Sequence, residues 1–319
     1  MKIYFAPLEG VTDTIFRRAH FESFPGVQKY FIPFVSPSYN LTFTSREQQA
    51  ISPVENAGIP AVPQILTRDA AHFVSFAKIL RDSGFAEVNL NLGCPSGTVT
   101  AKGKGSGLLR DPNALSAFLD EIYARSPLPV SVKTRIGFES DAEWPRILEI
   151  YRQYPISELI VHPRTRSQHY KGVANRSLCG AVFEGKHAPF VYNGDLFDAA
   201  DCARFLNEYP ETSALMIGRG LIANPALARE AAGGEKLTRE ELLAFHSKLY
   251  AVYTEKWPPK AVLGHMHEIM YYMVRCFDDA DKAAKAIRKS ARLDAYLDAV
   301  NRLFETCPLR ENPGFIPYD

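Results

Sequence analysis

The sequence predicts an α/β fold, a (β/α)8 TIM barrel over residues 1–234, followed by a small all-helical domain over residues 235–319. Three observations support this prediction. Eight short apolar runs alternate with amphipathic segments, which is the pattern of a barrel of parallel strands and helices. The glycine fingerprint of open dinucleotide-binding sheets is missing after the first strand. Gly233 and Gly234 mark a linker to a tail that contains no convincing strand.

The expected strands are runs in which apolar residues are continuous or alternate with polar ones. In chain order they lie at 3–6, 30–34, 61–66, 87–92, 130–134, 158–162, 190–193 and 214–217. Helices are expected between them at 12–20, 69–82, from 111, and at 141–153, 175–184, 198–207 and 224–231. Asp111 is a favoured N-cap, and Pro112 fits a first helical turn. Residues 36–57 are polar and weakly periodic, which predicts a long loop with one helical turn.

The tail is expected to form helices over 238–256, 260–276 and 279–305, the last of which could be broken. Five cations recur there at helical spacing and are expected on one broad face: Lys282, Lys285, Arg288, Lys289 and Arg292. Ala280, Ala284, Ile287 and Ala291 form a separate, tighter stripe. The cations have two interpretations, a solvated face over a packed stripe and a phosphate-binding face.

Composition limits the class of protein. The chain has 319 residues, of which 46% are hydrophobic and 23% charged, as in soluble globular proteins. The formal charge of +1 gives no global attraction to nucleic acid, so an anionic partner must meet a local patch. Five widely spaced cysteines without a CxxC pair predict neither a disulfide framework nor a metal site, and they fit the cytoplasm. We expect no signal peptide and no membrane span.

A predicted strand ends in a cysteine at residues 88–96. Its apolar residues alternate with Asn89 and Asn91, so the two amides point the same way. A glycine and a proline then end the strand around Cys94. By itself this pattern fits a small buried cysteine as well as a catalytic thiol.

Polar residues follow nearly every predicted strand, and in this fold chemistry takes place at those strand ends. They are Glu9, Gln64, Asn91, Cys94, Lys133, Arg135, His162, Arg164, Asn193, Asp195 and Arg219. A packed barrel does not need so many, and the sequence therefore predicts an enzyme.

Individual strand ends allow more specific hypotheses. Asn193-Gly194-Asp195 and Gly218-Arg219-Gly220 predict a phosphate site, because glycines let backbone N–H groups approach an anion. Lys133 could be a Schiff-base nucleophile or a cation that holds the electronegative edge of a cofactor. His162 could be an acid/base group or a hydrogen-bond donor.

These residues resemble the tRNA-dihydrouridine synthase family of the FMN-dependent, bacterial type, and the resemblance covers essentially the whole chain. The motifs that carry it begin with Ala6-Pro7-Leu8-Glu9-Gly10-Val11-Thr12-Asp13, Asn91-Leu92-Gly93-Cys94-Pro95 and Gly105-Ser106-Gly107-Leu108-Leu109. They continue with Ser131-Val132-Lys133-Thr134-Arg135-Ile136-Gly137, His162-Pro163-Arg164-Thr165, Gln168-His169-Tyr170-Lys171-Gly172, Asn193-Gly194-Asp195 and Ile217-Gly218-Arg219-Gly220. All occur in the family's order, each at a predicted barrel loop.

The resemblance implies an FMN-binding catalytic barrel and a helical tRNA-binding domain. It implies reduction of the C5–C6 bond of specific D-loop uridines, with NADPH as electron donor and hydride transfer from N5 of reduced FMN to C6. Cys94 would then give the proton to C5, since an ordinary thiol has a pKa of about 8.5 and is protonated near neutrality. A monomer is expected, without an obligatory protein partner.

The resemblance also implies which residues bind each molecule. FMN is expected to contact Pro7, Leu8, Glu9, Gln64, Lys133, His162, Asn193, Gly194, Asp195, Gly218 and Arg219. The tRNA is expected to contact Asn91, Arg135, Arg164 and Tyr170 on the same ground. Lys282, Lys285, Lys289 and Arg292 are added on the hypothesis that the basic face of the tail binds its phosphates. The Gly/Ser/Lys-rich residues 95–110 are expected to form a mobile loop beside Cys94 that acts as a lid.

The sequence departs from the family at a few positions, and alternatives remain. Leu8 replaces a common methionine, Asn89 a common aspartate, and Pro163 a common glycine, while 264–267 matches the family's basic segment only loosely. The main alternative is an FMN-dependent oxidoreductase of a free pyrimidine, similar to dihydroorotate or dihydropyrimidine dehydrogenases. A class I aldolase that uses Lys133 and a non-catalytic RNA-binding barrel are two others.

Overall fold

The computed structural model describes residues 1–36, 38, 40, 42–185 and 188–316. Its described residues form one sheet with the strand order β3-β2-β1-β9-β8-β7-β6-β5-β4. The strands are β1 (Ile3–Phe5), β2 (Val27–Phe31), β3 (Ala61–Val62), β4 (Gln64–Ile65), β5 (Val88–Leu92), β6 (Val130–Gly137), β7 (Leu159–Thr165), β8 (Phe190–Tyr192) and β9 (Ala214–Ile217). The ladder between β2 and β3 and those from β4 through β9 are parallel.

The two edges of this sheet meet at Pro63. β3 pairs with β2 and β4 pairs with β5, so the predicted strand at 61–66 spans both edges. Proline has no N–H to donate to a ladder, which explains the interruption. The Pro63 carbonyl still accepts the N–H of Asn89 at 2.9 Å. With β3 and β4 taken as one strand, the sheet is a nearly closed barrel, and the predicted fold class is confirmed.

An ion cluster at the amino ends of the strands shows how far the sheet curls. Lys29 of β2 contacts Glu87, just before β5, at 2.7 Å and Glu158, just before β7, at 2.9 Å. The hydroxyl of Tyr4 on β1 also donates to Glu158, at 2.6 Å. β2 is separated from β7 by three strands in the sheet order, so these contacts require the sheet to curve around a common centre.

Helices connect the strands and form the tail. They are α1 (Thr14–Ser23), α2 (Ser45–Ala50), α3 (Ala70–Asp82), α4 (Gly97–Thr100), η1 (Gly105–Arg110), α5 (Pro112–Arg125), η2 (Asp141–Glu143), α6 (Trp144–Tyr151), η3 (Arg176–Phe183), α7 (Ala199–Glu208), α8 (Arg219–Ala223), α9 (Leu227–Ala231), α10 (Arg239–Lys256), α11 (Pro259–Met273), η4 (Val274–Cys276), α12 (Asp281–Lys289) and α13 (Leu293–Thr306). Asp13, Asp69 and Asp111 cap α1, α3 and α5 through their carboxylates.

The structure differs from these expectations at three places. β2 lies at Val27–Phe31 rather than at 30–34. The helix expected at 175–184 is the 3-10 helix η3. Residues 95–110, expected to form a loop, contain α4 and η1, and Ser106 is fully buried, while their role as a mobile lid stays a prediction.

The chain divides into two compact units. The first consists of Met1–Pro7, Lys29–Asp195 and Leu206–Met216, and the second of Leu8–Gln28, Leu196–Phe205 and Ile217–Asp319. The first unit carries nearly all of the sheet. The predicted division at residue 234 into a catalytic and an RNA-binding domain stays a prediction.

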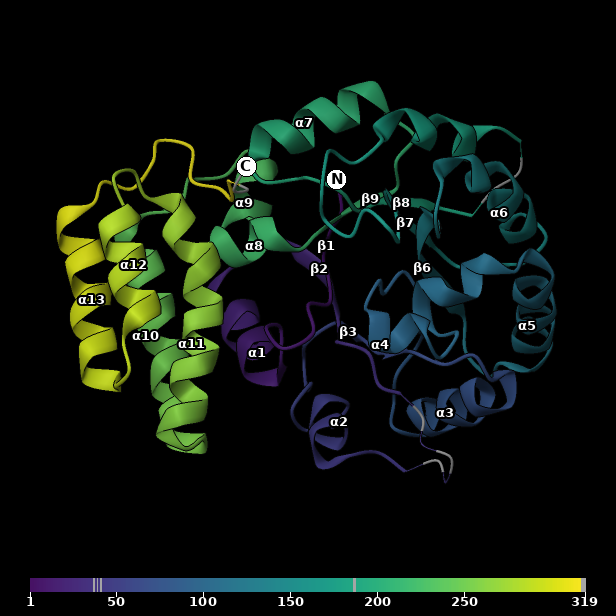
Figure 1. Ribbon diagram of the computed structural model, residues 1–319, viewed down its shortest axis with the longest axis horizontal. Coiled ribbons are helices and arrows are strands. Elements are labelled where there is room, and N and C mark those ends of the chain that lie inside the picture. The colour runs from purple at the N-terminus through teal and green to yellow at the C-terminus, as the bar shows by residue number, and fades with distance from the viewer. Residues whose placement is uncertain (37, 39, 41, 186–187, 317–319) are drawn as a thin grey trace. The chain divides into compact units, whose positions relative to one another are not determined.

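The second unit is helical. α10, α11, α12 and α13 lie side by side (Figure 1), and α1 packs on α10. The rings of Phe16 and Phe24 pack edge-to-face with the ring of Phe245 on α10, and their centroids lie 5.6 and 5.3 Å from its centroid. Among the described residues, no helix combines the length and the apolarity needed to span a bilayer.

Candidate active site

Cys94 lies in a turn at the carboxyl end of β5. Its backbone N–H donates to Asn91 Oδ1 at 2.9 Å, and the Gly93 N–H donates to the same oxygen at 3.1 Å. The Cys94 carbonyl accepts the Ser106 hydroxyl at 2.8 Å and the Ser106 N–H at 3.2 Å. The backbone of Cys94 is therefore held on both sides, and its half-buried side chain stands at the end of the strand.

A chain of buried amides leads from this turn into the barrel. Asn91 Nδ2 donates to Gln64 Oε1 at 2.6 Å, and Gln64 Nε2 donates to Asn89 Oδ1 at 2.7 Å. Asn89 Nδ2 in turn donates to Ser131 Oγ at 2.9 Å. All four side chains are buried. We call these residues, Asn91, Gln64, Asn89 and Ser131, the amide ladder.

The orientation of the amide ladder is fixed at one end. The N–H groups of Gly93 and Cys94 can only donate, so the atom of Asn91 that faces them must be its oxygen. Each following amide must then turn its oxygen toward Cys94 and its nitrogen away from it. The remaining N–H of Asn91 and of Gln64 has no partner within the described residues, so the ladder offers donors, and carbonyl oxygens of a ligand are what it can bind.

Lys133 neighbours Asn91 in the β5–β6 register. Burial, together with the Arg135 cation, lowers the pKa of its ammonium group to about 7, while Cys94 acts in the opposite direction. In the part of the chain that the structure describes, Lys133 Nζ has neither an ion pair nor a hydrogen-bond partner. A half-buried, uncompensated amine of this kind fits an anionic or electron-rich group of a ligand.

Arg135 is 2% exposed and holds backbone rather than projecting into solvent. Its Nε donates to the Gly93 carbonyl at 2.9 Å, and one terminal nitrogen donates to the carbonyls of Thr165 and His169, both at 2.8 Å. The Cys94 turn and the loop after β7 are therefore joined through one guanidinium.

Arg164, also 2% exposed, forms a bidentate ion pair with Asp195 at 2.7 and 2.9 Å. It also donates to His162 Nε2 at 3.0 Å and to the Gly172 carbonyl at 2.6 Å. Because arginine can only donate, Nε2 of His162 must accept, and the neutral ring carries its proton on Nδ1.

Tyr170 lies on the loop that these two arginines hold. It is 56% exposed, its ring centroid is 6.0 Å from that of His162, and the Arg135 guanidinium is 5.7 Å from it. The structure thus brings an exposed aromatic ring beside the predicted residues of β6 and β7.

Asn193 and Gly194 follow β8. Asn193 Nδ2 donates to the Met216 carbonyl at 2.8 Å, which joins the ends of β8 and β9. A Cβ on Gly194 would lie 2.4 Å from the Tyr192 hydroxyl, so only glycine fits there. Pro7 is half-buried and lies just beyond β1.

Four predicted FMN residues belong to the second unit. The Leu8 N–H donates to Thr12 Oγ1 at 2.9 Å, and Glu9 is exposed. Gly218 precedes α8, and the guanidinium of Arg219 lies 5.0 and 5.1 Å from the rings of Phe197 and Phe315.

The predicted cations of the tail are not all on one helix. Lys282, Lys285 and Lys289 are exposed on α12. Arg292 does not belong to α12, because that helix ends at Lys289. Arg292 instead contacts Asp294 at the start of α13. The expected continuous face from 282 to 292 is wrong on this point: the Ser290 hydroxyl donates to the Ile287 carbonyl and ends the helix.

The sequence patterns did not predict a role for two residues of the amide ladder, Asn89 and Ser131. Asn89 was noticed only as sharing a face with Asn91, and Ser131 only as part of a motif. Both alternate with buried apolar residues, so an inward polar residue on adjacent strands was a usable signal.

The chain matches the family model described as dihydrouridine synthase over residues 4–306. A tRNA-dihydrouridine synthase B of Pasteurella multocida is 32% identical over 231 residues, which are 72% of this chain and 68% of that protein. A second one, of Vibrio parahaemolyticus, is 29% identical over 313 residues, which are 92% and 95% of the two chains.

A solved structure, a variant of morphinone reductase in complex with tetrahydroNAD, has a TM-score of 0.50 and 13% identity and covers 78% of this chain and 90% of its own. That likeness supports the barrel fold alone. The family match extends across both compact units, and the chain belongs to the dihydrouridine synthase family.

Proposed function

We propose that this protein reduces the C5–C6 bond of specific D-loop uridines in tRNA to 5,6-dihydrouridine. The family match supports the reaction. The structural observation that assigns the reaction to particular residues is the Cys94 turn. The Cys94 thiol stands at a strand end, its backbone is held on both sides, and oriented amide donors lead from it into the barrel. The proposal includes a cytoplasmic, monomeric enzyme that receives electrons from NADPH.

Cys94 is the group that supplies the proton in this proposal. Its S–H bond breaks as C5 of the uracil gains hydrogen, and solvent then restores the thiol. The uracil carbonyls are acceptors, and the free N–H of Asn91 is a donor next to Cys94 in the turn. Asn91 thus orients the pyrimidine while its oxygen fixes the Cys94 backbone.

The residues of the barrel fit FMN as the cofactor. Lys133 is an unpaired cation for the electron-rich edge of the isoalloxazine ring, and Gln64 has an N–H left for its carbonyls. Asn193 and Gly194 follow β8, and Pro7, Leu8, Glu9, Gly218 and Arg219 complete the proposed contacts. When bound and reduced, FMN supplies the hydride that C6 receives.

Three predicted contact residues receive positioning roles instead. Arg135 and Arg164 are buried and donate to backbone carbonyls on either side of Tyr170, so they support the loop rather than meet RNA. Asp195 neutralises Arg164 and accepts the Ala174 N–H at 2.9 Å. Tyr170 is the exposed residue of this group and is proposed to contact the extruded nucleotide.

The decisive experiment is anaerobic. Purified protein is reduced with NADPH, mixed with unmodified tRNA transcript, and followed by flavin absorbance and by mapping of dihydrouridine. The wild type is expected to be reoxidised and to modify a D-loop uridine. Cys94→Ala is expected to lose nearly all product, while Cys307→Ala, a buried thiol of the tail, retains it.

Other outcomes would reject parts of the proposal. If a free pyrimidine reoxidises the flavin and tRNA does not, the substrate is a small molecule. Equal amounts of product from Cys94→Ala and Cys307→Ala would show that Cys94 is not the proton donor. A preparation without flavin that binds no FMN would reject the cofactor.

A further inference from the structure

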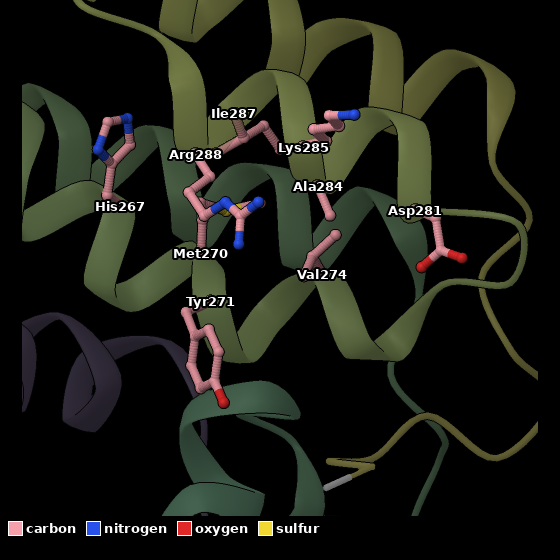
Figure 2. Close-up of a pocket in the computed structure, with 9 residues that line it drawn as sticks. All are labelled: His267, Met270, Tyr271, Val274, Asp281, Ala284, Lys285, Ile287 and Arg288. Atoms are coloured by element: carbon pink, nitrogen blue, oxygen red, sulfur yellow. The ribbon is translucent and has the colours of Figure 1, made fainter. Parts of the chain in front are cut away.

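A cavity of about 310 Å³ lies between α11 and α12, outside the proposed catalytic site (Figure 2). Its floor is apolar, since Met270 and Ile287 are 1% and 3% exposed and Val274 lies beside them. Tyr271, which is 45% exposed, lines one side. The Arg275 guanidinium lies 5.0 Å from the Tyr271 ring and the Tyr272 ring 5.1 Å away, so neighbours hold this aromatic surface in place.

The rim of the cavity is cationic. Lys285 and Arg288 line it, one helical turn apart on α12, against a single carboxylate, Asp281. Lys282 and Lys289 line a second hollow on the α13 side of the same helix, where Arg302 and two carboxylates, Asp279 and Asp298, also lie. Within the described part of the chain none of these four α12 cations forms an ion pair, unlike Arg292 with Asp294 and Arg310 with Asp278. They repel one another, so an anionic partner would be favoured here.

His267 adds a neutral polar group. The Ser290 hydroxyl donates to the Ile287 carbonyl at 2.7 Å, so it must accept from His267 Nε2 at 2.8 Å. Burial lowers the pKa of His267, so its ring is neutral at pH 7. Its Nδ1 is then an acceptor, which suits an N–H group of a ligand.

We propose that this cavity holds one unpaired nucleotide of the RNA substrate, with its base in the apolar hollow beside Tyr271 and its phosphate between Lys285 and Arg288. The proposal rests on the proposed function, because it takes tRNA as the ligand. A paired helix offers phosphates but no free base and would leave the apolar floor empty. An acidic peptide would satisfy the cations without using an aromatic wall. A base with its phosphate uses both features.

Equilibrium binding separates the two parts of the site. The full-length protein is titrated with unmodified tRNA transcript and, separately, with a blunt RNA duplex, at several salt concentrations. Tyr271→Ala is expected to weaken tRNA binding about fivefold or more, with an unchanged salt slope and unchanged duplex binding. Tyr271→Phe, which keeps the ring, is expected to bind as the wild type does.

The charge variant has a different signature. Lys285→Met with Arg288→Met is expected to weaken both RNAs and to lower the slope of log K against log salt by about 1 to 2. Lys78→Met, a control that removes one exposed cation from α3, is expected to leave the slope unchanged. A thermal melt of each variant confirms that the helices remain folded.

The proposal is wrong if Tyr271→Ala stays within twofold of the wild type on tRNA, or if it weakens duplex binding equally. Binding of a phosphorylated peptide at this cavity, with tRNA affinity untouched by the variants, would assign it to a protein partner and would also overturn the proposal. If the wild type forms no dihydrouridine and binds no tRNA, the proposed function itself has failed.

Discussion

The direction of the amide ladder has a consequence for single residues. Gln64→Glu places a carboxylate oxygen opposite Asn89 Oδ1, where Gln64 donates at present. Asn89→Asp also adds a buried carboxylate, but that group can still accept from Gln64 and can accept from the Ser131 hydroxyl. We therefore expect Gln64→Glu to lower the free energy of unfolding by about 1–3 kcal/mol more than Asn89→Asp.

Urea denaturation at pH 7 measures this difference, and the rate of dihydrouridine formation should fall in the same order. Each variant is the control for the other, because both replace an amide by a carboxylic acid within the buried amide ladder. Equal destabilisation would show that the hydrogen-bond direction does not matter and that only the buried charge does.

Lys133 provides a pH-dependent prediction. Its pKa of about 7 means that the ammonium form is present below pH 7 and is lost above it. In the proposed site the electron-rich edge of the flavin accepts a hydrogen bond from the ammonium form, so the dissociation constant for FMN should rise as pH increases from 7 to 8.5. The rise is at most about tenfold per pH unit for one linked proton. The phosphate of FMN has its second pKa near 6 and does not titrate in this window.

Quenching of flavin fluorescence in protein stripped of cofactor gives this constant. In Lys133→Met the group that titrates is absent, so affinity should be weaker at pH 7 and nearly independent of pH from 7 to 8.5. A parallel rise of the dissociation constant in the variant would assign the titration to another group.

At the scale of single residues, the sequence predicted which residues lie at the strand ends. It did not predict which of them form hydrogen bonds or ion pairs with one another. The family resemblance assigned Asp195 to FMN. Its partner Arg164 is 31 residues away in sequence, and only the adjacent ends of β7 and β8 bring the two together. The amide ladder likewise joins residues from β4, β5 and β6, a pairing that no local pattern contains.

At the scale of elements, η1 determines where Cys94 stands. Gly105 has φ +57°, and a Cβ there would lie 3.0 Å from the Cys94 Cβ. Gly105→Ala is therefore expected to lower the free energy of unfolding by about 1–2 kcal/mol, the usual cost of this conformation for an L-residue. Because the contact is with Cys94 itself, dihydrouridine formation should also slow.

Gly97→Ala is the matched control in the same segment. A Cβ at Gly97 would meet no heavy atom within 4 Å, and the backbone there is not left-handed, so this variant should retain stability and activity. Urea denaturation and product mapping compare the two. Identical behaviour of the two variants would mean that η1 does not position the thiol.

The elements missed or misplaced by sequence reasoning share a physical cause. β2 was shifted toward the apolar residues at 30–34 because Lys29 does not look like an inward strand residue. β6 and β7 were ended before Arg135 and Arg164 for the same reason. Each of these cations is satisfied by groups distant in sequence, so its burial is invisible to a local pattern. Helices with their own caps, such as α3 and α5, were placed closely.

At the scale of the whole barrel, the Lys29 ion cluster and the proposed active site lie at opposite ends of the same strands. Glu87 precedes β5 and Cys94 follows it; Glu158 precedes β7 and Arg164 lies near its other end. In this fold the amino end contributes stability and the carboxyl end carries the reaction. The Lys29 cluster is thus expected to govern folding without governing catalysis.

Lys29→Met tests this separation. It leaves Glu87 and Glu158 close together without their shared cation, in a cluster whose side chains are 14–23% exposed. Partial exposure makes the loss smaller than for a fully buried pair, and we expect about 1–3 kcal/mol in urea denaturation. Glu87→Gln is the control, since Lys29 then keeps Glu158, and it should lose less than Lys29→Met.

The rate of dihydrouridine formation, measured well below the unfolding temperature, should be the same in Lys29→Met and in the wild type. A slower rate with unchanged stability would show that the amino end of the barrel communicates with the Cys94 turn through β5. Unchanged stability together with an unchanged rate would show that contacts between strands close the barrel without the cluster. The expected result, lower stability at an unchanged rate, follows because the ion pair of Glu87 and the thiol of Cys94 lie beyond opposite ends of the five-residue strand β5.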